Sequence, residues 1–283
     1  MAVVTPTSNG TLIADEVQRL LVQPLTQQST YLSLGMPTFT SPGQPIKVPS
    51  LSSIGTATFA GAGSAIAEAT VSTSEVELLP STVWAAKRSI RVSNESLAQA
   101  VTNLESNFGS TLITELRRLV DENLWRGDGT SGAPTGMVNF ANNISHGTAV
   151  GTATTDDLYS MIETAQENDL ADATLHWAMS PAMLKRIRTL SDSTGRSLID
   201  GSLSDGAPAR ILGIGYTRTN HIDDDTLVLF DKAQVAVGVD STASLFITPH
   251  RYADTGETAI IGTFRADTAP MNAAVVIATG ITA

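Results

Sequence analysis

The chain has 283 residues, of which 42% are hydrophobic and 16% charged, so it can bury a large core and is not expected to be disordered. Its net charge of −11 argues against tight nonspecific binding of nucleic acid, which needs lysine and arginine against phosphate. The absence of cysteine excludes disulfides, thiolate metal sites and cysteine nucleophiles, and no apolar run reaches the length of a membrane span.

The N-terminal residues predict a polar arm followed by a short helix. Residues 1–9 form the arm, and residues 1–10 lack the basic and apolar regions of an export signal. From Leu12 to Leu25 the apolar residues recur at helical spacing, and Pro24 would end the helix. The helix either packs on the core of its own subunit or forms an arm on a neighbouring one, and the sequence leaves both open.

Residues 38–80 predict a long two-stranded excursion. Alternating runs at Ile46–Val48 and Val71–Leu78 flank a stretch of small residues from Gly55 to Ala69. Such a ribbon is at best marginally stable alone in water, because no further layer buries its faces. We therefore expect it to need a partner surface, and the alternative is a disordered segment.

A strand is predicted at Thr82–Val92, because polarity alternates along it. Its apolar face would carry Trp84, Ala86, Ile90 and Val92.

A single long amphipathic helix follows, from Ser96 to Trp125, with a length of about 45 Å at 1.5 Å per residue. Gly127-Asp128-Gly129 would end it. On its outer face Arg117–Asp121 and Arg118–Glu122 are spaced as ion pairs. The predicted buried stripe consists of Leu97, Val101, Leu104, Phe108, Leu112, Leu116, Leu119 and Trp125.

The second half of the chain predicts helices mixed with strands. One helix is expected at Asp156–Asn168, capped by Thr155, and another at Ala182–Leu190, with Pro181 in its first turn. Strands are expected at Ala173–Met179, Ile211–Thr217, Thr226–Phe230, Val235–Val239, Leu245–Thr248, Thr258–Asp267 and Ala273–Thr279. The predicted fold class is α+β.

No group of residues predicts a catalytic, cofactor or metal site. His146, His176, His221 and His250 are not spaced as metal ligands, and His176, within a strand, is expected to be packed and hydrogen-bonded. The run Asp223–Asp225 lacks the spaced ligands and the glycine of a calcium loop, so we expect an exposed turn. No phosphate loop or nucleophile elbow is present. A soluble α+β enzyme or binding module therefore remains only as an alternative.

The order and spacing of these elements resemble the major capsid protein of tailed bacteriophages, which has the Hong Kong 97 fold. The resemblance covers nearly the whole chain. It is carried by four phrases, each weak alone: Val92–Leu97, Gly127–Gly136, Trp177–Pro181 with Leu184, Leu190 and Gly195-Arg196 behind it, and Ile211–Tyr216.

The resemblance implies a division of the chain into an N-terminal arm (1–37), an extended loop (38–80) and a peripheral domain with a spine helix (81–141). An α/β axial domain (142–240), returning peripheral strands (241–272) and a C-terminal strand (273–283) would follow.

The resemblance also implies the function and the partners. The protein would not be an enzyme, and its copies would form pentamers and hexamers of an icosahedral shell around double-stranded DNA, without sequence-specific DNA contacts. A portal and a decoration protein would be its partners. A separate scaffold protein would be a third, because only a short arm precedes the first helix, the alternative being that the numbering begins at a processed end. It would assemble in the host cytoplasm and belong to the virion. A nanocompartment shell of the same fold, similar to encapsulin, is the alternative.

The extended loop carries Glu68, Glu75 and Glu77 against a single lysine, so it predicts a basic landing surface on the adjacent subunit. The alternative for each basic residue is a pair within its own subunit or a solvated side chain. The arginines considered for this surface are Arg91, Arg117, Arg118, Arg251 and Arg265.

Two further expectations concern maturation. Gly109 costs about 1 kcal/mol relative to alanine within a helix, so we predict a hinge there, close packing being the alternative. Some family members form Lys–Asn isopeptide bonds, with the lysine near the loop tip. Here Lys47 is the only loop lysine and lies near the base, so no cross-link is expected even though Asn272 matches the acceptor by position.

Overall fold

The computed structural model describes residues 29–53, 72–95, 104–145, 154–168, 170–190, 210–241, 244–252, 254–271 and 275–278. The predicted helix at Leu12–Leu25, the tip of the predicted loop and the linker at 191–209 lie outside these residues.

The described elements alternate between strands and a few helices. In chain order they are η3 (Leu32–Leu34), β1 (Thr38–Ser41), β2 (Ile46–Ser53), β3 (Ser72–Leu78), β4 (Ala86–Ser93), α4 (Leu104–Arg126), η4 (Met137–Asn139), β5 (Ile144–Ser145), α5 (Thr155–Glu167), β6 (Leu175–Met179), α6 (Pro181–Arg188), β7 (Arg210–Ile211), β8 (Ile214–Arg218), β9 (Leu227–Asp231), β10 (Val235–Asp240), β11 (Ser244–Tyr252), β12 (Glu257–Phe264), β13 (Ala266–Pro270) and β14 (Val275–Ala278).

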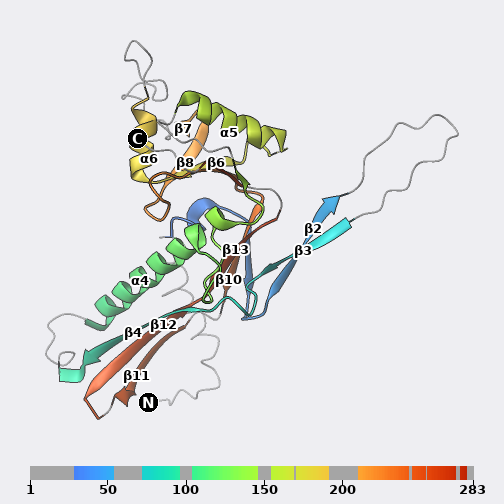
Figure 1. Cartoon of the computed structure of the whole chain (residues 1–283). Coiled ribbons are helices and arrows are strands. Elements are labelled where there is room, and N and C mark those ends of the chain that lie inside the picture. Colours follow the sequence, from blue (N-terminus) through green and yellow to red (C-terminus); the bar gives the residue numbers. More distant parts are fainter. Residues whose placement is uncertain are drawn as a thin grey trace, which may run out of the picture.

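A six-stranded sheet, in the order β5-β14-β9-β6-β8-β7, forms the upper body in Figure 1. Side chains alternate between its faces, as strand geometry requires. Trp177 and Leu229 join the core beneath α5 and α6, whereas Ala178, Val228 and Phe230 join the core that contains α4. The sheet is therefore packed on both faces, and it connects the two hydrophobic cores of the molecule.

The helix α4 packs on a three-stranded antiparallel sheet in the order β11-β12-β4. Gly262 on β12 allows this close approach, because a Cβ there would lie only 2.2 Å from Cδ2 of Leu112. The helix buries Leu112 and Leu116 as predicted. The prediction was wrong for Leu119, which is 43% exposed, because the observed stripe advances by four residues from Leu116 to Val120.

The outer face of α4 also differs from the prediction. Arg118 pairs with Glu115, one turn earlier, rather than with Glu122, and the distance between Nε and Oε2 is 3.8 Å. Asp121 is buried and accepts hydrogen bonds from Ser29 and Thr30. The local spacing predicted an exposed Asp121, but its carboxylate is hydrogen-bonded to residues distant in the sequence.

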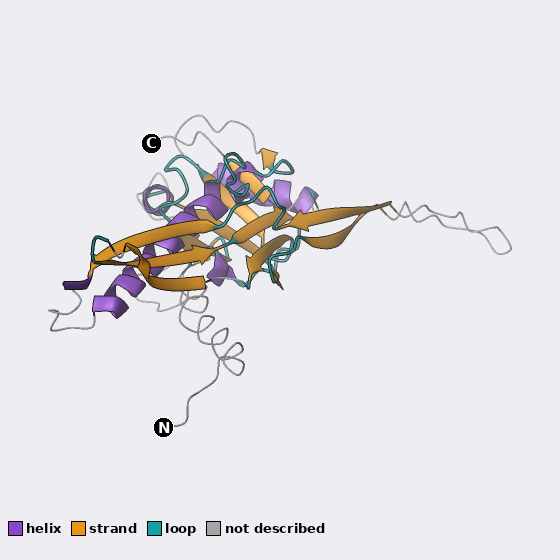
Figure 2. Ribbon diagram, turned by 90° about the horizontal axis from the view of Figure 1, so that it is seen from below, coloured by secondary structure: helices purple, strands orange, loops and turns teal. Residues whose placement is uncertain are grey.

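A second three-stranded sheet, β1-β10-β13, and the two-stranded hairpin β2-β3 complete the fold. The hairpin projects away from the body (Figures 1 and 2). Strand β1, at the start of the predicted loop, pairs in parallel with β10. Strand β10, assigned by resemblance to the axial domain, shares the core of α4.

Three local predictions were wrong in their bounds. The predicted strand Thr258–Asp267 is two strands in different sheets, because the chain changes sheet at Arg265. The predicted strand Ile211–Thr217 is the hairpin β7-β8, whose turn at 212–213 has positive φ at both residues. The cap of α5 is Thr154 rather than Thr155, because Asp157 completes a capping box with it.

Candidate assembly surfaces

The hairpin is the first candidate surface. Its strands pair in antiparallel register, with Val48 opposite Val76, and among the described residues they form a sheet of two strands. Lys47 Nζ lies 3.0 Å from Glu75 Oε2, and this hydrogen bond raises the pKa of Lys47. Glu75 and Glu77 are exposed, whereas Glu68 lies outside the described residues.

The root of the hairpin is held in an unusual backbone conformation. Leu79 has φ +54°, a left-handed value that a residue with a branched apolar side chain rarely adopts. Its side chain is fully buried together with that of Leu78. Both pack over Gly238 of β10, where a Cβ would lie 3.1 Å from Cγ of Leu79. The hairpin therefore leaves the body from a fixed point.

Two charged side chains from the β12–β13 region enclose this point. Asp267 accepts a hydrogen bond of 2.8 Å from the N–H of Leu79 and one of 2.9 Å from the N–H of Thr268. Arg265 donates to the carbonyl oxygens of Leu79 (2.9 Å), Val83 (2.8 Å) and Pro80. Burial raises the pKa of Asp267 despite these donors and the nearby guanidinium. We call Arg265, Asp267 and Leu79 the root clamp.

The root clamp bears on the prediction for Arg265. Its guanidinium donates to three carbonyl oxygens of its own subunit. The observed contacts of Arg265 therefore agree with the alternative stated above, in which the arginine pairs within its own subunit rather than with a neighbouring loop. Sequence spacing could not reveal this role, because Arg265 and Asp267 are nearly 190 residues away from Leu79.

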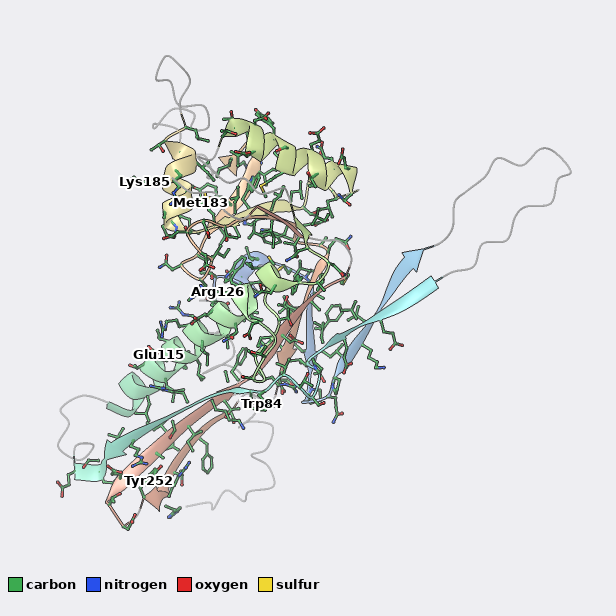
Figure 3. All side chains as sticks on the ribbon, in the orientation of Figure 1. Trp84, Glu115, Arg126, Met183, Lys185 and Tyr252 are labelled. Carbon is green, nitrogen blue, oxygen red and sulfur yellow. The ribbon has the colours of Figure 1, made fainter. Side chains whose placement is uncertain are left out.

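The other four arginines form two separate groups. Arg91 and Arg251 meet around Tyr252, with their Cζ atoms 4.0 and 5.4 Å from the ring centroid (Figure 3 labels Tyr252). Arg91 also lies 4.0 Å from Glu257. Arg117 and Arg118 are neighbours on α4, where Arg117 is half-buried and Arg118 is exposed and pairs with Glu115, which Figure 3 labels. The structure thus provides two basic regions rather than one.

The predicted hinge, Gly109, lies inside α4. The described backbone is helical on both sides of it, from Leu104 to Arg126. Whether the helix bends there during maturation stays a prediction.

The turn after α4 is fixed by close backbone contacts. A Cβ on Gly127 would lie 2.1 Å from the carbonyl oxygen of Pro134, and Gly132 lies directly against the ring of Trp84. Trp84 donates its backbone N–H to Gly132 at 2.8 Å, yet its side chain is 69% exposed. The prediction that Trp84 lies within the strand Thr82–Val92 was wrong, because β4 begins only at Ala86.

The segment before β1 is attached to the end of α4. Asp121 accepts from the hydroxyl of Ser29 and, at 3.0 Å, from the N–H of Thr30. Tyr31 packs edge-on against Trp125, with ring centroids 4.9 Å apart. Trp125 also donates its indole N–H to Thr30 at 3.2 Å. Residues 29–31, at the start of the first described segment, are therefore attached to α4 by hydrogen bonds and an aromatic contact.

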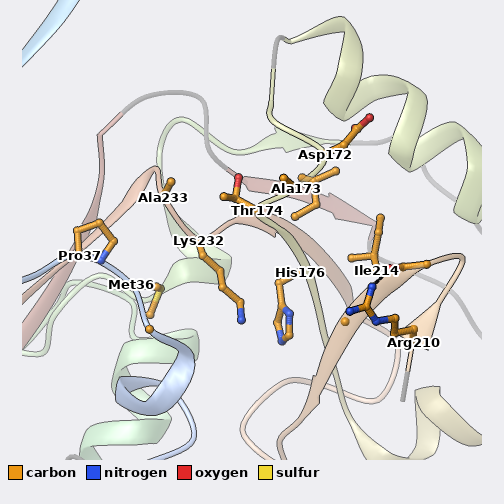
Figure 4. Close-up of a pocket in the computed structure, with 14 residues that line it drawn as sticks. Met36, Pro37, Asp172, Ala173, Thr174, His176, Arg210, Ile214, Lys232 and Ala233 are labelled. Atoms are coloured by element: carbon orange, nitrogen blue, oxygen red, sulfur yellow. Dashed lines mark hydrogen bonds between the residues drawn. The ribbon is translucent and has the colours of Figure 1, made fainter. Parts of the chain in front are cut away.

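A cleft of about 770 Å³ lies between this segment and the edge of the six-stranded sheet (Figure 4). His176, Arg210 and Lys232 line it. As predicted, His176 is packed and hydrogen-bonded, with Nε2 2.8 Å from the hydroxyl of Thr217 and the ring edge-on to Phe230. Burial and, to a lesser degree, the positive charge of Lys232 lower the pKa of His176 to about 4.

Neither metal ligands nor membrane helices stand out in the part of the chain that the structure describes. Within it, no group of three or more His, Asp or Glu side chains is arranged to hold a metal ion. Its helices are too short or too polar to cross a bilayer. The Asp223–Asp225 turn is exposed as expected, and Asp223 pairs with Arg126.

Removing the carboxylate of the root clamp should destabilise the fold. Asp267→Ala leaves the buried N–H groups of Leu79 and Thr268 without their acceptor, and we expect a loss of about 1–3 kcal/mol in the free energy of unfolding. Chemical denaturation measures this, with the exposed Asp254→Ala as control, expected within about 0.5 kcal/mol of the parent protein. Equal stability of the two variants would contradict the assigned role.

His176 should make stability depend on pH. Its folded pKa of about 4 lies below the ordinary value of 6.5, so the unfolded chain takes up a proton first as the pH falls. Its stabilising contribution is complete above pH 6.5 and is lost progressively toward pH 4. We expect His176→Gln to reduce the fall in melting temperature between pH 7 and pH 5. An unchanged fall would show that other groups cause it.

Comparison with known proteins agrees with this architecture. A family model described as the Phage capsid family matches residues 9–280. No curated protein matches. Among solved structures, the capsid of the empty GTA particle has a TM-score of 0.74 at 16% identity, with 90% of this chain and 91% of that chain covered.

Two phage proteins have the same fold at similarly low identity. The structure from Microbacterium phage Oxtober96 has a TM-score of 0.68 at 16% identity, and 89% of this chain and 90% of that chain are covered. For Mycobacterium phage Cain the TM-score is 0.65 at 16% identity, with 100% of both chains covered. Because the family model spans nearly the whole sequence, this chain belongs to the phage capsid family and is a structural shell protein rather than an enzyme.

Proposed function

We propose that this chain is the major capsid protein of a tailed phage and forms an icosahedral shell of pentamers and hexamers around double-stranded DNA. The observation that carries the proposal is the β2-β3 hairpin, which projects from the body as a two-stranded sheet. Such a ribbon is stable only against a further layer. Within a shell, the adjacent subunit supplies that layer.

The root clamp supports this role energetically. A flexible docking segment loses conformational entropy when it binds, and this loss reduces the net binding free energy. The buried leucines and the contacts of Arg265 and Asp267 fix the direction of the hairpin before it docks. More of the interface energy is then available for holding neighbours together, in contacts that bury about 2,000–5,000 Å² when they are obligate.

Charge directs where the hairpin docks. Its exposed Glu75 and Glu77, together with Glu68, meet a basic region on the adjacent subunit. The two arginine groups, Arg91 with Arg251 and Arg117 with Arg118, are the surfaces proposed for it. Arg265 is left out, because its donors are engaged at the root clamp.

The organisation by parts follows the resemblance, adjusted to the fold. The arm (1–37) and the loop precede the peripheral domain around α4, and residues 142–240 form most of the axial domain. The loop proper begins after β1, and β10 packs with the peripheral core. Residues 241–272 return to the peripheral domain, and the C-terminal strand contains β14, which lies in the six-stranded sheet.

Further partners are a separate scaffold protein, a portal and a decoration protein, and assembly takes place in the host cytoplasm before the protein becomes part of the virion. DNA is enclosed without sequence-specific contacts, in keeping with the net charge of −11.

Gly109 serves as the hinge of α4, and Gly109→Ala particles that still expand normally would refute this. No Lys–Asn cross-links form, so denaturing electrophoresis of mature particles gives a single monomer band.

Electron microscopy of the purified protein tests the proposal. We expect closed shells, and we expect the triple reversal of Glu68, Glu75 and Glu77 to lysine to reduce their number at least about tenfold, because like charges then oppose docking. A control with Glu163, Glu167 and Asp254 reversed to lysine changes the net charge equally. If the parent protein forms small soluble particles and no closed shells, the shell function is rejected. If the triple reversal in the hairpin and the control reversal form equal numbers of shells, the charge contact is rejected. DNA inside shells from infected cells distinguishes a phage from a nanocompartment.

A further inference from the structure

The sheet β11-β12-β4 ends in two edges of opposite chemical character. Strand β4 carries the exposed basic side chains Lys87, Arg88 and Arg91, and such charges protect an edge from pairing with a copy of itself. Strand β11 forms the other edge, and residues 244–248 within it carry no charge. Phe246 and Ile247 are 60% and 47% exposed. Only the β11 edge is therefore unprotected.

The protection of β11 begins immediately after these five residues. Pro249 has no backbone N–H to donate to a further strand. The pairing register of β11 with β12 also shifts between Thr248 and Tyr252, which marks an irregularity of the kind that blunts sheet edges. The edge that can accept another strand is thus Ser244–Thr248, and we call it the neutral edge.

The two exposed apolar residues of the neutral edge lie on opposite faces of the sheet. Phe246 is in register with Ile261, and Ile247 is in register with the buried Ile260, which belongs to the core of α4. The helix α4 packs on β4 and β12, and β11 lies one strand beyond them. A strand added at this edge would cover apolar surface on both faces.

The neutral edge is complementary to itself. Its sequence, Ser-Leu-Phe-Ile-Thr, has polar ends, apolar residues inside them and Phe246 at the centre. In an antiparallel pair related by a two-fold axis at Phe246, Ser244 lies opposite Thr248 of the other copy, and Leu245 opposite Ile247. Every pair matches in polarity, and no like charges meet.

We propose that the neutral edge pairs with the neutral edge of a second copy of this chain, antiparallel and centred on Phe246, to form a continuous six-stranded sheet across a two-fold contact. Pro249 does not prevent this pairing, because it lies opposite residue 243 of the other copy, before β11 begins. A closed two-fold contact uses one patch twice, so one short edge is sufficient.

The contact between two neutral edges is too small to hold two free subunits together. Five residues per strand bury far less than the roughly 1,200–2,000 Å² of a stable independent interface. The pair therefore forms between subunits that other contacts already hold side by side, as in a shell. In this respect the inference rests on the proposed function.

The absence of cysteine makes a direct test possible. In the proposed pair Phe246 lies opposite itself, with Cα atoms about 4.5–5.5 Å apart, which a disulfide can bridge. We expect Phe246→Cys particles to give disulfide-linked dimers under mild oxidation at least about tenfold faster than Ser244→Cys or Thr248→Cys particles. In each of these controls the two cysteines of a pair would be about 13 Å apart, four residues along the strand.

A second variant retains the phenylalanine. Ser244→Cys/Thr248→Cys in one chain places a cysteine of each copy opposite one of the other, so dimers should form at both positions. Closed particles in which neither this double variant nor Phe246→Cys links faster than the single controls would overturn the pairing and leave the shell function intact. If microscopy finds no closed particles of the parent protein, the shell function fails and the pairing fails with it.

Discussion

The root clamp is the contact on which the rest of the structure depends. Leu79 accepts a left-handed backbone angle that its side chain disfavours, and Asp267 and Arg265 satisfy the N–H and C=O groups exposed by that turn. Arg265 lies between β12 and β13, where the chain changes sheet, and Asp267 is the second residue of β13. The direction of the hairpin is thus fixed at the junction between two sheets of the body. A force that a neighbouring subunit exerts on the docked hairpin is therefore transmitted to the body.

The body can resist a pull on the hairpin because β6 and β9, two inner strands of the six-stranded sheet, are almost completely buried. One face packs beneath α5 and α6, and the other joins the core of α4. Tyr31, Trp125 and Phe230 form an edge-on aromatic series across this second core, with centroid separations of 4.9 and 6.4 Å. Because the series joins the entering chain, the spine helix and the sheet, the candidate contact surfaces project from one connected support.

The elements with strong local patterns could be predicted from the sequence. The hairpin strands, α4 with its glycine-rich turn, and α6 behind Pro181 have periodicity or capping that acts over a few residues. Some errors are local, such as the cap of α5, but others lie where distant residues decide. Asp121 was assigned to the helix surface but accepts a hydrogen bond from Ser29, about 90 positions away. The single strand predicted at Thr258–Asp267 is divided at Arg265, because the chain changes sheet there. No local signal indicates such partners, so the root clamp could not be found from the sequence.

Charge separates the surfaces that would otherwise compete during assembly. A shell protein must leave strands unpaired until a neighbour arrives, and each exposed edge also invites wrong pairings. Here the hairpin is acidic, the β4 edge is basic and the edge at Ser244–Thr248 is neutral. Two acidic hairpins repel each other, as do two basic edges, whereas the neutral edge pairs with its own kind without opposing charge. Specificity can therefore arise from the sign of a few side chains, even though every surface offers the same backbone hydrogen-bonding groups.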